Sequence, residues 1–420
     1  MLWSQQSAKR LPMQSAEDLD LGDPLSHIRK QFDLPSDKIY LDGNSLGALS
    51  TAVKQALTKT VDQEWGNDLI ESWNSHDWID APERVGDKIA TLIGVNHGEV
   101  LCCDNLSINL FKCLAAGLEI QAPKTRILVE ATHFPTDNYM AQGLSSLLGE
   151  ERCSVEAVAV DDLLTTDFSD VALLSLSHVD YKTGELRNLP MITAQAQQAG
   201  ALVIWDLAHS AGVVDVDLNN HNADMAVGCT YKFLNAGPGA PGYLFMATRH
   251  QHARNSLPGW MGHADRFAFE ADYRPADSIR RFLTGTQSVL ALSATEAALS
   301  LFEQTSIGQI RAKSLALSDY FLSELNEYSA TKPISVITPR DYNSRGSQVS
   351  LKLDHAFAVS QALIARGVIV DFREPDIVRF GFSPLYTRFD DCHRAVSALA
   401  DILDTGVYQE SQFNLRKTVT

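Results

Sequence analysis

The sequence has few cysteines, little positive charge and no long apolar run. Lysine and arginine together number 35 against 52 aspartates and glutamates, so the formal net charge is −17. Nucleic acid is therefore not an expected partner, because phosphate binding needs basic patches. The longest apolar runs are too short to span a membrane, and residues 1–10 hold no apolar stretch of a secretory signal.

The six cysteines are Cys102, Cys103, Cys113, Cys153, Cys229 and Cys392. None forms a C-x-x-C pair, so no metal site is expected. Their scatter favours a reducing compartment, and we expect a cytoplasmic protein.

The length of 420 residues fits one large and one small domain. Hydrophobic residues make up 45% and charged residues 21%, values typical of a globular enzyme. We expect a large cofactor-binding domain over residues 51–300 and a small α+β domain over residues 301–420. Residues 1–50 are expected to form an N-terminal segment that joins the small domain.

Strand and helix patterns alternate through the middle of the chain. Strands are predicted at residues 127–130, 171–177, 201–207, 225–230 and 242–247, and helices at residues 107–118, 136–148 and 191–199. This alternation predicts an α/β fold with a mostly parallel sheet wrapped by helices. After a helical stretch at residues 290–328, short strands at 349–353, 368–372 and 377–380 alternate with helices at 356–366 and 390–403.

Two of the buried-strand patterns end in chemically active residues. Asp206 follows the apolar run 201–205, and Lys232 follows the run 225–231. Ligands of parallel sheets bind beyond the carboxyl ends of the strands, so this acid and this amine are expected to share a pocket. The pair suits pyridoxal phosphate (PLP), whose aldehyde needs a lysine and whose ring nitrogen needs an acid. The alternatives are a helix cap for Asp206 and a surface loop position for Lys232.

Gly237, Gly239 and Gly242 match G-x-G-x-x-G, a pattern of dinucleotide sites. That fingerprint requires a helix after the glycines, whereas Pro238 and Pro241 interrupt this stretch and a strand follows it. The segment therefore predicts a turn that presents Lys232.

Four further residues have both a functional and a structural interpretation. Ser107, at the start of an apolar helix, is either part of an anion site or an ordinary N-cap. Phe134 either stacks on a flat ring or belongs to the core, and Asp137 either lines the pocket or caps a helix. Arg379 lies inside a strand pattern, where it either binds a substrate carboxylate or forms a structural ion pair.

Taken together, these segments resemble kynureninase, within the class V, fold-type I PLP enzymes. The matching stretches are residues 43–47 (Gly-Asn-Ser-Leu-Gly), 134–137 (Phe-Pro-Thr-Asp), 177–179, 183–184, 205–212, 231–232, 258–263 and 379–386. The pieces around Asp206, His209 and Lys232 are shared by the wider class, whereas residues 43–47, 134–137 and 259–260 are more specific to kynureninase.

The resemblance implies a role for each candidate residue. Lys232, Tyr231 and Asp206 would be catalytic: Lys232 holds PLP and moves the α-proton, Tyr231 carries a proton in later steps, and Asp206 binds the ring nitrogen. The other implied cofactor contacts are Leu106, Ser107, Phe134, Asp137, His209, Trp260 and Thr286, and the implied substrate contacts are Asn44, Ser45 and Arg379. Trp260 and Thr286 would reach across the interface of a homodimer.

The implied reaction is hydrolysis of the Cβ–Cγ bond of L-kynurenine or its 3-hydroxy form. Two positions depart from the family pattern. Thr286 stands where some members have asparagine, and no residue among Trp73, His76 and Trp78 clearly matches an early-loop histidine that contacts the substrate in some members.

Two other classes of protein share part of the pattern. A cysteine desulfurase needs a nucleophilic cysteine on a mobile loop, and Cys392, in a helical pattern, is the sole C-terminal candidate. A binding module on a degenerate PLP fold is expected to lose the lysine or the acid, and this chain has both.

Overall fold

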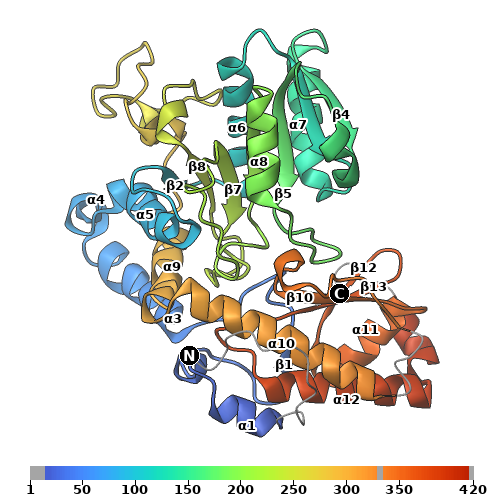
Figure 1. Cartoon of the computed structure of the whole chain (residues 1–420). Helices are drawn as coiled ribbons and strands as arrows, with labels where there is room; N and C mark the ends of the chain where they lie inside the picture. The colour runs from blue at the N-terminus through green and yellow to red at the C-terminus, as the bar shows by residue number, and fades with distance from the viewer. Residues whose placement is uncertain (1–14, 329–333, 416–420) are drawn as a thin grey trace.

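The computed structural model describes residues 15–328 and 334–415 of the chain. Figure 1 shows the two parts of this structure: a large sheet flanked by helices in the upper half, and a smaller sheet with α10, α11 and α12 in the lower half. In this described part of the chain, no helix has the length and apolarity needed to cross a membrane.

The large sheet has seven strands. In spatial order they are β2 (Val100–Cys102), β8 (Gly242–Met246), β7 (Met225–Cys229), β6 (Leu202–Asp206), β5 (Val171–Ser177), β3 (Arg126–Glu130) and β4 (Ser154–Val158). β8 pairs antiparallel with both of its neighbours, and β7, β6, β5, β3 and β4 are parallel. The predicted mostly parallel sheet is therefore confirmed.

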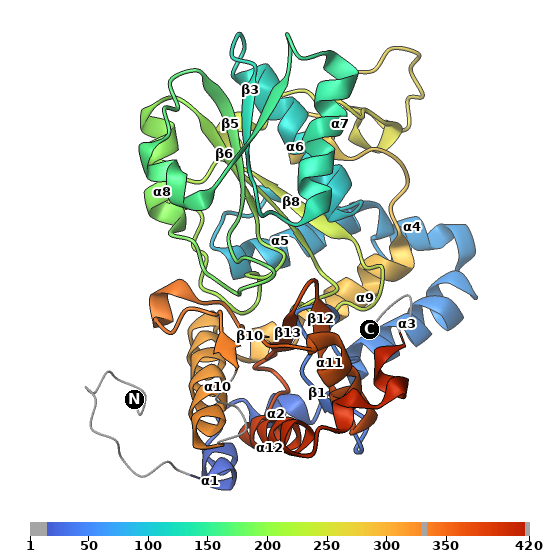
Figure 2. The ribbon, with the colours of Figure 1, turned by 90° about the vertical axis from the view of Figure 1, so that its right-hand side faces the viewer.

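Helices cover both faces of this sheet, as Figure 2 shows with α7 and α8 on opposite sides of the strands. The side chains of α6 (Leu106–Ile120) and α7 (Pro135–Leu148) pack in one core with Leu202 and Ile204 of β6. Those of α5 (Ala81–Ile93) and α8 (Leu189–Gln198) pack in another core with Val203 and Trp205 of the same strand. Because each face is covered, every residue of β6 is buried, which explains its unbroken apolar run.

The smaller sheet is antiparallel and has its own core. Its strands, in spatial order, are β12 (Asp371–Arg373), β13 (Ile377–Gly381), β10 (Gln348–Lys352) and β9 (Ser335–Val336). The helices α10 (Ile307–Glu327), α11 (Ala356–Ala365) and α12 (Phe389–Thr405) share a hydrophobic core with these strands. This part of the chain is the α+β unit that the sequence predicts.

The N-terminal segment packs with the C-terminal part of the chain. β1 (Ile39–Tyr40) pairs in parallel with β11 (Val368–Ile369), and α1 (Ala16–Leu21) contacts α12. On this basis we propose the division into residues 1–50, 51–300 and 301–420. Residues 1–14, 329–333 and 416–420 of these units lie outside the described residues.

Helices also connect the two parts. They are α2 (Ser26–Arg29), α3 (Thr51–Lys59) with a π-helical turn at Thr60–Trp65, α4 (Ser72–Ser75) and α9 (Val289–Leu299). The predicted helix at residues 290–328 is wrong as one element, because α9 and α10 are separate. Ser306 begins α10 by accepting a hydrogen bond from the Gln309 N–H at 3.2 Å, and the Gln309 side chain bonds back in a capping box.

The predicted strand at residues 368–372 is also split. Its first residues, in β11, pair with β1, whereas β12 pairs with β13 in the smaller sheet. The short strands β2, β4 and β9 were not predicted. β2 has three residues, and β4 lies at the edge of the sheet, where its half-exposed residues lack a continuous apolar pattern.

A buried amine holds three distant segments together. Lys112, on α6, is fully buried, and its Nζ donates hydrogen bonds of 2.6 Å to Asp104 Oδ2 and to the Phe282 carbonyl oxygen. It thereby joins the loop before α6 to the 3₁₀ turn Ile279–Phe282, just ahead of Thr286.

Replacing Lys112 with methionine is expected to lower the free energy of unfolding by about 3 kcal/mol, because it leaves Asp104 and a buried carbonyl without their partner. Urea unfolding followed by circular dichroism measures the change. The control is Lys88→Met, since the Lys88–Glu303 pair is exposed (33% and 60% of the side chains) and should contribute less than about 1 kcal/mol. Equal losses in the two variants would contradict the structural role of Lys112.

Candidate active site

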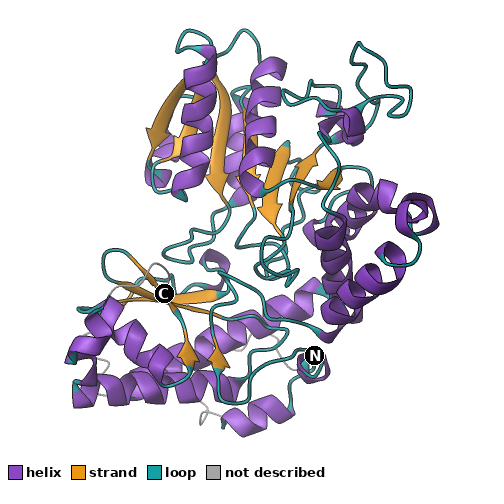
Figure 3. Cartoon of the chain, turned by 180° about the vertical axis from the view of Figure 1, so that it is seen from behind, coloured by secondary structure: helices purple, strands orange, loops and turns teal. Residues whose placement is uncertain are grey.

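A cavity of about 200 Å³ lies at the carboxyl ends of β5, β6 and β7. Figure 3 shows most arrowheads of the large sheet pointing toward the smaller sheet, from which Arg373 and Arg379 line the cavity. The residues that line the cavity are Asn44, Ser45, Leu106, Ser107, Phe134, Thr136, Asp137, Ser177, Tyr181, Asp206, Ala208, His209, Tyr231, Lys232, Arg373 and Arg379.

The acid and the amine predicted to share a pocket do lie in this one cavity. Asp206 is the last residue of β6, and Lys232 follows β7, its parallel neighbour. The Asp206 Oδ1 accepts a hydrogen bond from the Ala208 N–H at 2.7 Å, which fixes the carboxyl group. Burial raises the pKa of Asp206, while His133 and Lys232 act in the opposite direction and favour the carboxylate.

His209 lies directly beside the amine, with its Nε2 2.9 Å from Lys232 Nζ. Burial lowers the pKa of His209 well below its usual value, and the positive charges of Lys232 and Arg379 lower it further. The ring is therefore neutral and accepts a hydrogen bond from the lysine. Its Nδ1 is buried and makes no hydrogen bond to any described residue.

The turn predicted from the glycines after Lys232 is present. Gly237 and Gly239 have φ angles of 95° and 73°, in the region that favours glycine. Gly242 then opens β8 beside α6, where a Cβ atom would lie 2.6 Å from the Leu106 nitrogen. The glycines thus serve a tight turn and a close backbone approach, and no helix follows them.

The amino end of α6 points into the cavity through Leu106 and Ser107. The N-cap is Asn105, whose Oδ1 accepts a hydrogen bond from the Ile108 N–H at 3.0 Å. The alternative of Ser107 as an ordinary N-cap is therefore wrong. The first N–H groups of a helix lack partners within it, so this end offers donors to an anion.

Phe134 and Asp137 flank the start of α7. Phe134 is 45% exposed and contacts Tyr181 edge-on, with ring centroids 5.3 Å apart, so it is not a core residue. Asp137 is buried within the first turn of α7 and does not cap it. Burial raises the pKa of Asp137 well above its usual value, and the charge of Asp206 raises it further.

Arg379 lines the cavity and also forms a structural ion pair. Its Nε donates to Asp371 Oδ1 at 2.6 Å, and its Nη2 contacts Asp371 Oδ2 and donates to Ser45 Oγ at 3.1 Å. Ser45 Oγ donates in turn to Asp371 at 2.8 Å. The structural ion pair is therefore present, and it holds the guanidinium plane in place beside the cavity; binding of a substrate carboxylate stays a prediction.

The pKa of the Tyr231 phenol is shifted in the direction opposite to the one expected for a proton carrier. The hypothesis of a proton carrier requires a lowered pKa, but neighbouring Cys229 and burial raise the pKa of Tyr231. In this structure the phenol keeps its proton, which suits a proton donor.

The sequence interpretation missed several lining residues: Thr136, Ser177, Tyr181, Ala208 and Arg373. Arg373 directly follows the predicted strand at residues 368–372, and the sequence interpretation gave it no role. Its place beside Arg379 depends on the β12–β13 register, in which Asp371 pairs with Arg379 and Arg373 pairs with Ile377.

Trp260 and Thr286 do not line this cavity. Trp260 lies in the 3₁₀ turn Trp260–Gly262 with 37% of its surface exposed, and Thr286 is exposed. Both side chains face outward from this chain.

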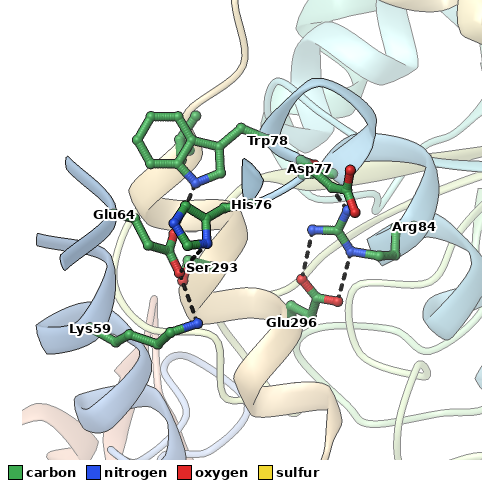
Figure 4. Close-up of a pocket in the computed structure, with 10 residues that line it drawn as sticks. Lys59, Glu64, His76, Asp77, Trp78, Arg84, Ser293 and Glu296 are labelled. Carbon is green, nitrogen blue, oxygen red and sulfur yellow. Dashed lines mark hydrogen bonds and ion pairs between the residues drawn. The ribbon is translucent and has the colours of Figure 1, made fainter. Parts of the chain in front are cut away.

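The early-loop candidates His76 and Trp78 lie in a different cavity, of about 320 Å³, which shares no lining residue with the first (Figure 4). His76 Nε2 lies 2.6 Å from Asp68 Oδ2, and Trp78 Nε1 donates to Glu64 Oε2 at 2.9 Å. Across the cavity, Arg84 Nε donates to Glu296 Oε1 at 3.0 Å. Trp73 packs edge-on against Trp78, with ring centroids 5.8 Å apart.

Comparison with solved structures defines the class of this fold. An apo cysteine desulfurase from Thermococcus onnurineus NA1 matches with a TM-score of 0.76 and 19% identity, covering 95% of this chain and all of that one. A mutant of the protein C-DES, with glycine covalently linked to its PLP cofactor, matches with a TM-score of 0.77 and 18% identity, covering 89% and 99%. The fold is therefore that of the fold-type I PLP enzymes.

Comparison with characterised sequences narrows the class to one family. The kynureninase of Burkholderia pseudomallei (strain 1106a) is 48% identical over 412 residues, which cover 96% of this chain and 98% of that protein. The kynureninase of Pseudomonas fluorescens is 45% identical over 407 residues, with the same coverage. The family description "Kynureninase C-terminal domain" matches residues 310–399. The chain belongs to the kynureninase family.

The desulfurase alternative shares the fold but lacks its nucleophile in this structure. Cys392 is buried on α12, and burial raises its pKa well above the usual value. A protonated thiol inside a helix does not meet the need for an exposed thiolate on a mobile loop.

A second carboxyl group near Arg379 titrates close to neutrality. Burial, and after it the charge of Asp371, raises the pKa of Asp42 from 3.8 to about 7. The folded state thus binds this proton more tightly than the unfolded chain does. The proton stabilises the fold fully below pH 3.8, and this stabilisation is lost as the pH rises to about 7.

The variant Asp42→Asn should therefore gain stability relative to the unmodified protein as the pH rises from 5 to 8, by on the order of 2 kcal/mol. Urea unfolding at the two pH values measures the gain. Asp33→Asn, at an exposed position, controls for the loss of one carboxylate. A difference that stays constant between pH 5 and 8 would contradict the assignment.

Proposed function

We propose that this protein hydrolyses the Cβ–Cγ bond of L-kynurenine, of 3-hydroxy-L-kynurenine, or of both. The products are anthranilate or 3-hydroxyanthranilate, and L-alanine, in tryptophan catabolism and NAD biosynthesis. The observation that carries the proposal is 48% identity to a kynureninase over 98% of that protein. The cavity adds to it, because it brings Asp206 and Lys232 together.

The residues present fit PLP as the cofactor. The cavity combines a helix amino end for the phosphate, an amine for the aldehyde and a buried acid for the ring nitrogen. Neither the buried Nδ1 of His209 nor Oδ2 of Asp137 makes a regular hydrogen bond in the described structure, although Asp137 Oδ2 lies 3.2 Å from His133 Nδ1, and both residues line the cavity. When bound, PLP withdraws electrons from the α-carbon of the substrate.

We assign Asp206 to the ring nitrogen and Phe134 to the face of the ring. His133 and Lys232 favour the ionised form of Asp206, and a carboxylate in this buried place stabilises a protonated ring nitrogen. Phe134 exposes nearly half of its surface at the cavity, which leaves its face open for stacking. Leu106, through its N–H, and Ser107 and Tyr231 are assigned to the phosphate.

Lys232 is proposed to hold the cofactor and to move the α-proton. The neutral ring of His209, 2.9 Å from Nζ, accepts a hydrogen bond and orients the amine. Tyr231 keeps its proton in this environment, and it is proposed to deliver a proton to the β-carbon when the Cβ–Cγ bond breaks.

Arg379 is proposed to bind the α-carboxylate of the substrate. Asp371 fixes the guanidinium plane, so the group loses little conformational freedom on binding. Arg373 adds a second positive charge at the cavity, and Asn44 and Ser45 supply polar groups beside it.

We also propose a homodimer with shared active sites. An aromatic patch on the isolated chain comprises Trp260, Phe267 and Phe269, which are 37%, 62% and 77% exposed. Exposed patches of large apolar side chains mark interaction surfaces. Trp260 and Thr286 of the partner subunit would then complete the phosphate site that Leu106 and Ser107 begin. A cytoplasmic location is proposed from the six unpaired, buried cysteines.

The first test is the reaction itself. The purified protein with PLP should produce fluorescent anthranilate from L-kynurenine or 3-hydroxyanthranilate from the 3-hydroxy form, and the ratio of the two efficiencies defines its preference. Lys232→Ala should lower activity roughly a thousandfold and remove the borohydride-sensitive absorbance. Lys88→Ala, which changes an exposed lysine, is the control. If neither substrate yields a product, the proposed function is wrong.

The second test concerns the shared sites. Lys232→Ala and Trp260→Ala should each be nearly inactive as homodimers. In a mixed dimer, one site combines an intact Lys232 with an intact Trp260 of the other subunit. Unfolding and refolding the two variants together should restore about a quarter of the original activity, because about half of the dimers are mixed and each has one intact site. A mixture as inactive as its parents would show that each site uses a single chain.

A further inference from the structure

His133 lies beneath the proposed cofactor site but does not line the cavity. It stands in the turn between β3 and α7, and its side chain is fully buried. One nitrogen of His133, one oxygen of Asp137 and one oxygen of Asp206 all lie within 4.8 Å of one another. A buried histidine between two buried acids needs a physical reason, because each group is costly to bury alone.

The hydrogen-bonding geometry of this trio is incomplete on the cavity side. His133 Nδ1 lies 3.2 Å from Asp137 Oδ2 and 3.5 Å from Ser177 Oγ. His133 Nε2 is buried and has no hydrogen-bond partner in the described structure. The imidazole thus has one nitrogen engaged and the other without a partner, and burial lowers the pKa of His133 while the charge of Asp206 acts in the opposite direction.

The two acids repel each other when both are ionised. The charge of Asp206 disfavours ionisation of Asp137, while His133 is the strongest influence, after burial, on Asp206, and it favours the carboxylate. The other charged groups that act on the trio are Glu130, Asp180, Arg187 and Lys232. Arg187 is already paired with Glu130 at 2.8 Å, so His133 and Lys232 are the basic side chains that act on Asp206.

We propose that His133 is a positioning residue for Asp206: it orders the buried His133–Asp137–Asp206 trio and holds the Asp206 carboxyl group aimed at the cofactor ring nitrogen. This role rests on the proposed PLP function. It assigns to His133 no contact with substrate or with the cofactor. Its effect on the cofactor passes through the carboxylate of Asp206.

The test is a double-mutant cycle read out as the dissociation constant of PLP. The cofactor-free protein is titrated with PLP, and binding is followed by absorbance and by quenching of tryptophan fluorescence. His133→Leu should weaken PLP binding about tenfold, because Asp206 loses the buried polar neighbour that holds its carboxyl group in place. In the Asp206→Asn background the same change should weaken binding less than about threefold, since the group through which His133 acts is gone.

A matched control uses a second buried histidine–acid pair. His250 Nε2 lies 3.0 Å from Asp224 Oδ1, just before the opposite end of β7 from Lys232. His250→Leu should leave the dissociation constant of PLP unchanged, even if it lowers stability. The absorbance spectrum of bound PLP gives a second readout: it should differ in His133→Leu from that of the unmodified protein and remain the same in His250→Leu.

Either of two results would overturn the role of His133: unchanged PLP binding and spectrum in His133→Leu, or the same loss of affinity in both backgrounds. If His133→Leu does not fold, His133→Asn replaces it, because the asparagine amide sits close to the position of Nδ1 but has no counterpart of Nε2. It should show the same dependence on Asp206, and independence would again overturn the role. Absence of saturable PLP binding by the unmodified protein would instead overturn the proposed function itself.

Discussion

Burial of the Asp206 carboxyl at the end of a fully buried strand is the constraint on which the site depends. An isolated carboxylate is costly to bury, so the surroundings must favour its charge or leave it protonated. The fold places Lys232 just after the neighbouring strand, where it favours the charge, and His133 in the turn after β3, beside the carboxyl group. The acid is thus held ready for a cationic ring without being exposed to water.

On the other side of the cavity, too, a buried charge is held beside a group of opposite charge. Arg379 is buried in a strand of the smaller sheet, and Asp371 on the next strand neutralises it. Asp206 belongs to the large sheet and Arg379 to the small sheet, and each sheet packs against its own hydrophobic core. The cavity lies where the two meet, so an amino acid bound there would have its reacting end at Lys232 and its carboxylate at Arg379.

Much of the fold could be predicted because the relevant signals are local. Apolar runs that end at Asp206 and Lys232 identify buried parallel strands, and the glycines after Lys232 identify a turn. Errors occurred where the deciding interaction was not local. The cap at Ser306 divides a long helical pattern, and the residues around Val370 divide between two sheets because their partners lie far away in the chain.

The sequence by itself determined the groups available to this protein: an acid, an amine, a helix start beside them and a family pattern that joins them. Only the tertiary structure decided which partners these groups have and how their pKa values shift. It paired Arg379 with Asp371, kept the proton on Tyr231, and put His133 beside Asp206. The physical reason is that charge interactions depend on distance and burial, which arise from strand register and packing between segments far apart in sequence.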